Sequence, residues 1–220
     1  NRGRPHREFA RRIGRLAAWL RGAGVQRGDR AAILAQNTTD HFELQFACQR
    51  LGAIFVPLNW RLTVPELRFI VGDAPPRVMI HDAEVDETVA ALCQAVPGMA
   101  ALRRGGGASD YERALAGVEP LAQPEIVSHD DVSTIMYTSG TTGHPKGAMI
   151  THGMTFWNVV NLGMPVEVGF STVFLAVLPL FHTGGLNCCA DPGFHAGGPV
   201  LVVRTFEPAD ALRLIADPAA

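Results

Sequence analysis

Short apolar runs alternate with helix-patterned segments along most of the chain, and this alternation restricts the folds that it can adopt. Strand-like runs cover residues 31–37, 53–59 and 77–82, and helical spacing covers 41–53 and 84–96. Parallel strands need a crossover between them, and a helix is the usual crossover. The order therefore predicts an α/β fold in which helices flank a mostly parallel sheet on both faces.

Two further helices carry local signals. In the first, apolar residues recur at spacings of four, three and four, and arginines fill the other side. The apolar residues are Phe9, Ile13, Leu16 and Leu20, and the arginines are Arg7, Arg11, Arg12, Arg15 and Arg21. We interpret the arginines as a solvated helix face. In the second, Thr63 stands three residues before Glu66, a capping-box pattern that predicts a helix start and tolerates Pro65 in the first turn.

Residues 103–128 interrupt the alternation, because glycines and prolines surround one short helical piece there. The later strand-like runs are 132–138, 148–152, 171–180 and 199–204, and a helix with Pro208 in its first turn ends the pattern. The run Cys188–Pro192 is apolar and then turn-like. We expect the interruption to be a surface connection, which leaves a first α/β portion at 1–128 and a second portion at 129–220.

Composition excludes several classes of protein. The formal net charge of -2 gives no reason to expect nucleic acid as a partner. The four cysteines lack CxxC spacing, which predicts reduced thiols and a cytoplasmic location. The histidines include no HExxH or other close helical pair, which argues against a metallohydrolase. No run is apolar enough to span a membrane. The chain begins in mid-pattern and ends straight after a helical run, so we expect a piece of a longer protein.

The loop TSGTTGHPKG, residues 138–147, gathers the groups that bind phosphate. Its glycines let backbone N–H groups converge on an anion, and its hydroxyls can donate to phosphate oxygens. Lys146 is the only lysine among 19 basic residues, and its compact ammonium on a long stem can follow a phosphate group that moves. The loop therefore predicts a phosphate site.

Three other interpretations of this loop fit its residues less well. A Gly-rich hairpin with an exposed Pro145–Gly147 turn needs glycine and proline, but it does not need the hydroxyls and the lysine. A Walker loop requires Gly-Lys-Ser/Thr, whereas Lys146 follows Pro145. A serine-hydrolase elbow requires GxSxG, whereas Ser139 lies in YTSGT. Phosphate binding explains more of the residues than any of the three.

The stretch YTSGTTGHPKGAMITH resembles the phosphate-loop signature of the adenylate-forming, AMP-binding superfamily, which includes acyl-CoA synthetases. The resemblance extends to GDRAAILAQNTTDHFELQFACQRLGAIFVPLNWRLTVPEL before it and to LPLFHTGGLN and GGPVLVVRTFEP after it, so it spans nearly the whole chain. It implies part of the large N-terminal domain of an acid–thiol ligase. Such an enzyme uses ATP and Mg²⁺ to convert a carboxylic acid to an acyl-adenylate, and then usually transfers the acyl group to a thiol such as that of coenzyme A.

The resemblance also implies roles for individual residues. The β- and γ-phosphates of ATP would be held by Thr138, Ser139, Gly140, Thr141, Thr142, Gly143 and Lys146. The pocket for the acyl substrate and adenylate would contain Phe181, His182, Thr183 and Gly184. Amino-acid-activating relatives commonly place an aspartate where His182 stands, and an α-ammonium group without that partner would be costly to bury. We therefore expect a fatty or aryl acid as the substrate.

The family's later motifs have no match in these 220 residues. They carry the Mg²⁺-binding acid, the ribose-binding aspartate and the adenylation lysine of a mobile C-terminal lid domain, so this stretch alone is expected to be inactive. A homodimer is a further expectation. Two alternatives remain open at this stage: a non-catalytic nucleotide or acyl-ligand binding module, and an NTPase or phosphotransferase with an unusual phosphate loop.

Overall fold

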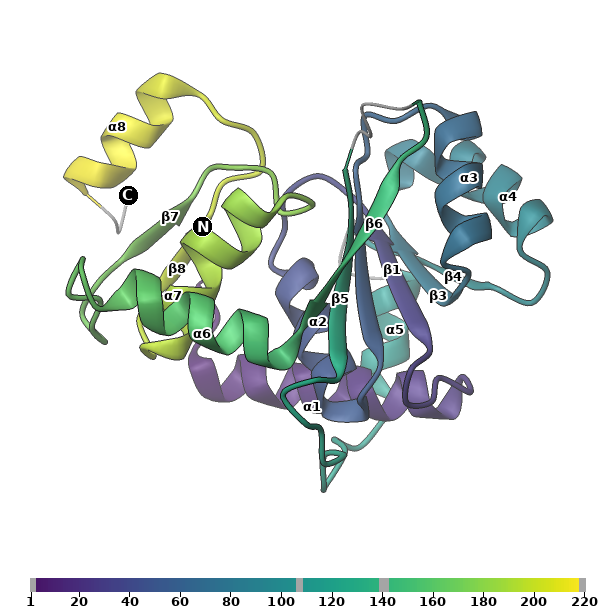
Figure 1. Ribbon diagram of the computed structural model, residues 1–220, viewed down its shortest axis with the longest axis horizontal. Helices are drawn as coiled ribbons and strands as arrows, with labels where there is room; N and C mark the ends of the chain where they lie inside the picture. The colour runs from purple at the N-terminus through teal and green to yellow at the C-terminus, as the bar shows by residue number, and fades with distance from the viewer. Residues whose placement is uncertain (1–2, 106–108, 139–142, 218–220) are drawn as a thin grey trace.

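The computed structural model describes residues 3–105, 109–138 and 143–217. Its main feature is a six-stranded sheet in the order β4-β3-β1-β2-β5-β6 (Figure 1). The strands are β1 Arg30–Leu34, β2 Ile54–Leu58, β3 Pro76–His81, β4 Ala100–Arg103, β5 Val132–Thr138 and β6 Lys146–Thr151. Every neighbouring pair is parallel except β5 and β6. The predicted α/β fold with a mostly parallel sheet is confirmed.

Helices cover both faces of this sheet (Figure 1). One face carries α1 His6–Gly22, α2 Asp40–Leu51 and α5 Asp110–Ala116. The other face carries α3 Val64–Asp73 and α4 Asp86–Ala95. The 3₁₀ turn η1 Ala83–Val85 directly precedes α4. Successive residues of β1 point to opposite cores, so Ala31 and Ile33 pack toward α1 and α2 while Ala32 and Leu34 pack toward α3 and α4. A strand buried on both faces explains the unbroken apolar run in its sequence.

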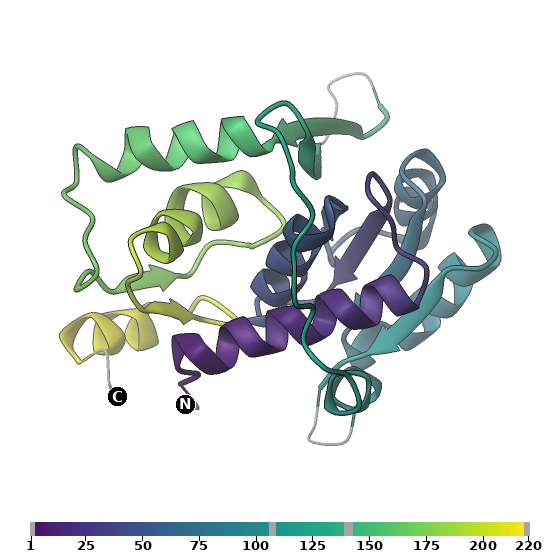
Figure 2. The same cartoon turned by 90° about the horizontal axis from the view of Figure 1, so that it is seen from below.

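A smaller group of elements stands beside the main sheet (Figure 2). It contains a two-stranded parallel sheet of β7 Phe174–Ala176 and β8 Val200–Val202, with α6 His152–Gly163, the π-helix η2 Gly184–Ala190, α7 Asp191–His195 and α8 Pro208–Ala216. The turn predicted at Cys188–Pro192 is wrong, because η2 runs directly into α7 there and Pro192 lies in the first turn of α7, where its missing N–H is tolerated. The strand predicted at 171–180 is confirmed only for its central residues.

The arginine face of α1 is only partly solvated, so the prediction that all five arginines form a solvated face is wrong for Arg12. Arg7, Arg11 and Arg21 are exposed, but the side chain of Arg12 is only 14% exposed. Its Nε donates to Glu43 Oε1 at 2.7 Å, and its Nη1 and Nη2 donate to the Glu112 carboxylate, each at 2.8 Å. The packing of α5 and α2 against α1 supplies these acids, which local periodicity cannot reveal.

The start of α3 agrees with the sequence. The backbone N–H of Thr63 donates to Glu66 Oε2 at 2.8 Å, and the Thr63 hydroxyl donates to the same oxygen at 2.7 Å. Glu66 thereby satisfies a donor that the first helical turn leaves without a partner. No helix in the described residues is long and apolar enough to cross a membrane.

Candidate functional site

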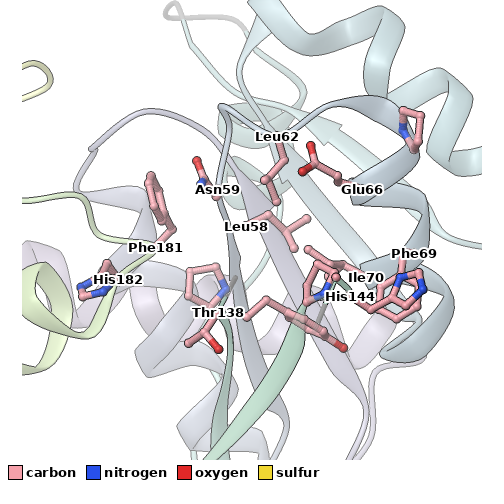
Figure 3. A pocket seen from close by; sticks show the side chains of 15 residues that line it. Leu58, Asn59, Leu62, Glu66, Phe69, Ile70, Thr138, His144, Phe181 and His182 are labelled. Carbon is pink, nitrogen blue, oxygen red and sulfur yellow. The ribbon is translucent and has the colours of Figure 1, made fainter. Parts of the chain in front are cut away.

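A cavity of about 610 Å³ opens at the carboxyl ends of β2 and β5 (Figure 3). It is lined by Pro57, Leu58, Asn59, Leu62, Pro65, Glu66, Phe69, Ile70, Tyr137, Thr138, Gly143, His144, Pro145, Phe181 and His182. In parallel α/β sheets, ligands bind beyond the carboxyl ends of the strands, where connecting loops converge. Segments that are distant in the sequence meet here, because α3 forms one wall and the segment after β7 forms another.

The cavity brings together several of the residues that the sequence singled out. Thr138 ends β5, Gly143 and His144 precede β6, and Phe181 and His182 reach the cavity from the segment after β7 (Figure 3). Ser139, Gly140, Thr141 and Thr142 lie outside the described residues. Thr138 and the residues Gly143–Pro145 of the phosphate loop therefore border the same cavity as the residues expected to contact the acid.

Three predicted residues do not line this cavity. Lys146 is the first residue of β6 and is exposed. Thr183 precedes η2, and its hydroxyl donates to Asn187 Oδ1 at 3.1 Å. Gly184 opens η2, and its N–H donates to His182 Nδ1 at 3.1 Å. Thr183 and Gly184 thus lie next to the cavity and hold η2 and the His182 ring in place.

The phosphate loop connects an antiparallel pair of strands. Thr138 of β5 faces Lys146 of β6 in the register, and the pairing continues to Val132 and Thr151. This is the topology of the hairpin alternative, so hairpin geometry and phosphate binding are not exclusive here. Hairpin geometry alone still gives no reason for the hydroxyls and for the sole lysine at the first position of β6.

Both flanks of the loop rest on α3. Before the loop, the Tyr137 hydroxyl donates to Asp73 Oδ2 at 2.5 Å. Burial and the neighbouring Asp73 carboxylate raise the pKa of Tyr137 above its usual range, so the hydroxyl stays protonated and donates. After the loop, the His144 ring stacks on Phe69 with 4.9 Å between ring centroids (Figure 3). Neither contact is visible in the sequence, since the partners are in different elements.

Two polar residues outside the predicted set hold the segments around the cavity. Asn37 follows β1, and its side chain hydrogen-bonds the backbone of Leu178 and Leu180, just before Phe181. Arg61 lies over the Phe181 ring, with 5.8 Å between its Cζ and the ring centroid. Both residues stand in stretches that carry the family resemblance, which was the only sequence signal for them.

A buried acid at the start of α7 joins α2 to the π-helix η2. Asp191 accepts from Gln45 Nε2 at 3.1 Å and from Asn187 Nδ2 at 3.0 Å. Burial raises the pKa of Asp191 to about 7, although the hydrogen bonds from Gln45 and Asn187 favour the charged form. Asn187 also accepts from Thr183, so this chain of side chains runs from the core to the residue after His182.

The described residues offer donors for phosphate but no ready metal site. They contain no group of three or more His, Cys, Asp or Glu side chains placed to hold a metal ion. The exposed Thr138 hydroxyl and the exposed Lys146 ammonium fit a polyanion, because both can donate and neither is blocked by burial. These groups therefore suit the phosphates of a nucleotide better than a metal ion held by protein ligands alone.

Comparisons with known proteins point to one family. Residues 5–218 match the sequence pattern of the family described as AMP-binding enzyme. The chain is 43% identical over 208 residues to a feruloyl-CoA synthase of an Amycolatopsis species, covering 94% of this chain and 40% of that protein. It is 36% identical over 220 residues to an indoleacetate–CoA ligase of Aromatoleum aromaticum, covering 93% of this chain and 41% of that protein.

The fold matches solved structures of similar proteins. The ATP-bound structure of MatB from Rhodopseudomonas palustris has a TM-score of 0.89 with 31% identity, and the match covers 96% of this chain and 42% of that chain. An inhibitor-bound N-terminal domain of FACL13 from Mycobacterium tuberculosis has a TM-score of 0.83 with 29% identity, covering 94% and 52%. This chain thus spans about 40% of the length of the curated relatives that it matches.

Proposed function

Because the chain belongs to the family of AMP-binding enzymes, we propose that it takes part in activating a carboxylic acid with ATP and transferring the acyl group to coenzyme A. In the first step an oxygen of the acid attacks the α-phosphorus of ATP, and the bond to the β-phosphate breaks to release pyrophosphate. In the second step the thiol sulfur of coenzyme A attacks the acyl carbon, AMP leaves, and the thiol proton passes to solvent or to a base.

One observation supports this proposal above the others. The ends of the phosphate loop and the segment Phe181–His182 border one cavity, although about forty residues separate them in the sequence. A nucleotide held by the loop would therefore have its phosphates within reach of an acid held beside Phe181 and His182. Attack of a carboxylate on phosphorus brings two anions together, so cationic and N–H groups at the phosphates are what the reaction requires.

Within the proposal, the loop residues share the work on the ATP tail. Thr138, Ser139, Gly140, Thr141, Thr142 and Gly143 supply hydroxyls and backbone N–H groups, and Lys146 supplies a mobile charge. Lys146 forms no ion pair with any described residue, so its ammonium is available to a phosphate. Mg²⁺ would offset further phosphate charge when bound, and its protein ligands are expected beyond the described residues.

The acid is proposed to be a fatty or aryl acid, with an aryl acid favoured. The names of two relatives, a feruloyl-CoA synthase and an indoleacetate–CoA ligase, denote aromatic acids. The cavity wall is largely apolar, and Glu66, the carboxylate among its described lining residues, already accepts two hydrogen bonds from Thr63. An α-ammonium group would therefore find no free acidic partner there. A cytoplasmic location, a homodimer and the division at residue 128 stay predictions.

Lys146→Met in the complete protein tests the role of the loop. We expect adenylate formation, measured as pyrophosphate release, to slow by about 100-fold. The reason is that the variant lacks the positive charge that would stabilise the departing pyrophosphate. Thioester formation from supplied acyl-adenylate should change by about twofold or less, since pyrophosphate has already left. Arg68→Met, which removes an exposed cation on α3, is the control and should change neither step. Equal slowing of both steps would contradict the assigned role.

The isolated 220 residues provide a second test. We expect them to bind ATP weakly and to release no pyrophosphate with any acid, because the chain spans about 40% of its relatives' length. Robust turnover by this stretch would refute that expectation. If the complete protein binds ATP and acids but releases neither pyrophosphate nor ADP, the binding-module alternative is favoured, and ADP as product favours a phosphotransferase.

A further inference from the structure

The segment Leu178–His182 places Phe181 and His182 at the cavity, yet it belongs to no helix or strand. It begins two residues after β7 and ends where η2 approaches, and its internal support is limited. The N–H of His182 donates to the Pro179 carbonyl at 3.1 Å, which closes a tight turn but does not fix the turn relative to the main sheet. A separate contact must set where this turn stands.

Asn37 makes that contact from the main sheet. Its Nδ2 donates to the carbonyl of Leu178 at 2.9 Å and to the carbonyl of Val203 at 3.2 Å. Its Oδ1 accepts the backbone N–H of Leu180 at 2.9 Å. Asn37 thus bonds both sides of Pro179 and also the residue that follows β8. The residue is only 9% exposed, so these hydrogen bonds lie largely out of water.

The chemistry of the contact is specific to an amide side chain. A carboxamide of this length presents two N–H donors and one acceptor in a plane, and all three functions are used here. An aspartate could accept from Leu180 but could not donate to the two carbonyls. An apolar residue would leave all three backbone groups without this partner in a nearly dry site.

The segment that carries Asn37 is attached to the main sheet. It follows β1, which lies between β2 and β3 within the main sheet. The neighbouring Gln36 N–H donates to Asp82 Oδ2 at 3.0 Å, and Asp82 is also paired with Arg104. On the other side of the turn, Gly185 fits so closely that an added Cβ would lie 2.3 Å from the Pro179 oxygen. The turn is therefore held between Asn37 and η2, and Phe181 follows directly after the bonded residue Leu180.

From this arrangement we propose that Asn37 is a positioning residue that sets the place of Phe181 and His182 in the cavity. It joins the carboxyl end of β1 to the segment after β7 and to the end of β8. It does not line the 610 Å³ cavity itself, so its effect on a ligand acts through Phe181 and His182. The proposal depends on the proposed function in one respect, namely that Phe181 and His182 contact the acid and not ATP.

Asn37→Ala and Asn37→Asp in the complete protein test the proposal, with Asn158→Ala as the matched control. Asn158 in α6 also has an amide side chain that bonds a backbone carbonyl, because its Nδ2 donates to Asn187 O at 3.0 Å. It does not line the cavity. We expect Asn37→Ala to raise KM for the acid by about tenfold or more, the effect of losing one to two net hydrogen bonds. KM for ATP should stay within about twofold. Asn37→Asp should shift KM in the same direction, and Asn158→Ala should leave both KM values unchanged.

A ligand-free measurement separates this proposal from the proposed function. In Asn37→Ala, hydrogen exchange at the amides of Leu180 and His182 should speed up by about tenfold or more, while the amides of β1 keep their protection. If the wild-type protein shows no acid-dependent turnover but hydrogen exchange in Asn37→Ala speeds up as expected, the proposed function fails. The role of Asn37 in holding the turn is then still supported. Unchanged exchange at Leu180, or equal increases in KM for acid and ATP in a folded variant, would overturn the positioning role. If Asn37→Ala does not fold, Asn37→Asp decides through the KM values alone, because it loses the two donors but keeps the acceptor for the Leu180 N–H.

Discussion

Replacing Asp191 by asparagine should change how the stability of the protein depends on pH. Asp191 is buried among the side chains that join α2 to η2, and burial raises its pKa from the ordinary 3.8 to about 7. Between these two values the native state keeps the proton while the unfolded state has lost it. The free energy of unfolding therefore falls as the pH rises through this window, and above about pH 7 the full cost of a buried carboxylate is present.

The size of the effect follows from the shift in pKa. One pKa unit corresponds to about 1.36 kcal/mol, and about two units of the shift lie between pH 5 and pH 7. An asparagine side chain has no proton to lose, so the gain in stability of Asp191→Asn over wild type should grow by about 3 kcal/mol between about pH 5 and about pH 8. The new amide can also donate to Gln45 Oε1, a buried oxygen without a hydrogen-bond partner among the described residues.

Urea unfolding of both proteins across this pH range measures the difference. All other ionisable groups are present in both proteins, so their contributions cancel in the comparison. Asp130→Asn, at an exposed position, is the control and should leave the pH dependence unchanged. A stability difference between Asp191→Asn and wild type that stays constant with pH would refute the reasoning, because it would mean that Asp191 is ionised in the native state throughout.

Two further pairs of variants test the frame of the site. Tyr137→Phe removes the 2.5 Å hydrogen bond to α3 beside the phosphate loop and should weaken ATP binding several-fold with little loss of stability. Tyr111→Phe, which removes a buried hydrogen bond to a carboxylate, should cost about 1–3 kcal/mol by chemical denaturation and leave ATP affinity unchanged; the reverse pattern would contradict both assignments. Gly185→Ala should destabilise by about 2–3 kcal/mol and abolish acid-dependent turnover, because its Cβ meets the Pro179 carbonyl. Gly72→Ala, in an open position of α3, should stabilise slightly, and similar melting temperatures for these two glycine variants would sink the steric argument.

Much of the fold could be predicted from the sequence because a buried strand or helix has a characteristic local pattern of apolar residues. Strands β1, β2 and β3 are buried on both faces, so each appears as an apolar run bounded by turn residues. The sequence does not predict β4, since Leu102 is the only buried residue among its four. A short, mostly exposed strand has no apolar run in its sequence. Its pairing with β3 is a tertiary contact, which local sequence does not reveal.

The candidate site was predictable in its chemistry and less so in its geometry. Hydroxyls, glycines and one lysine in the phosphate loop indicate an anion regardless of the surrounding fold, and His182 follows an aromatic residue in a stretch with a family resemblance. The contacts that hold these groups are long-range. Asn37 is 141 residues from Leu178, and Tyr137 is 64 residues from Asp73. No local periodicity or spacing carries such pairings.

The two sheets explain why Asn37 matters more than a residue of its type usually does. In a single parallel sheet, the shared ladder of hydrogen bonds sets the relative height of the loops at the carboxyl edge. Here Thr138 ends a strand of the main sheet, whereas Phe181 and His182 follow β7, which pairs only with β8 among the described strands. No ladder fixes one loop against the other, so side-chain contacts between the sheets must do so. Asn37 supplies three hydrogen bonds of this kind in one residue. Variants at the boundary between the sheets should therefore affect acid and nucleotide binding unequally, whereas variants inside either core should lower stability and leave the ratio of the two affinities unchanged.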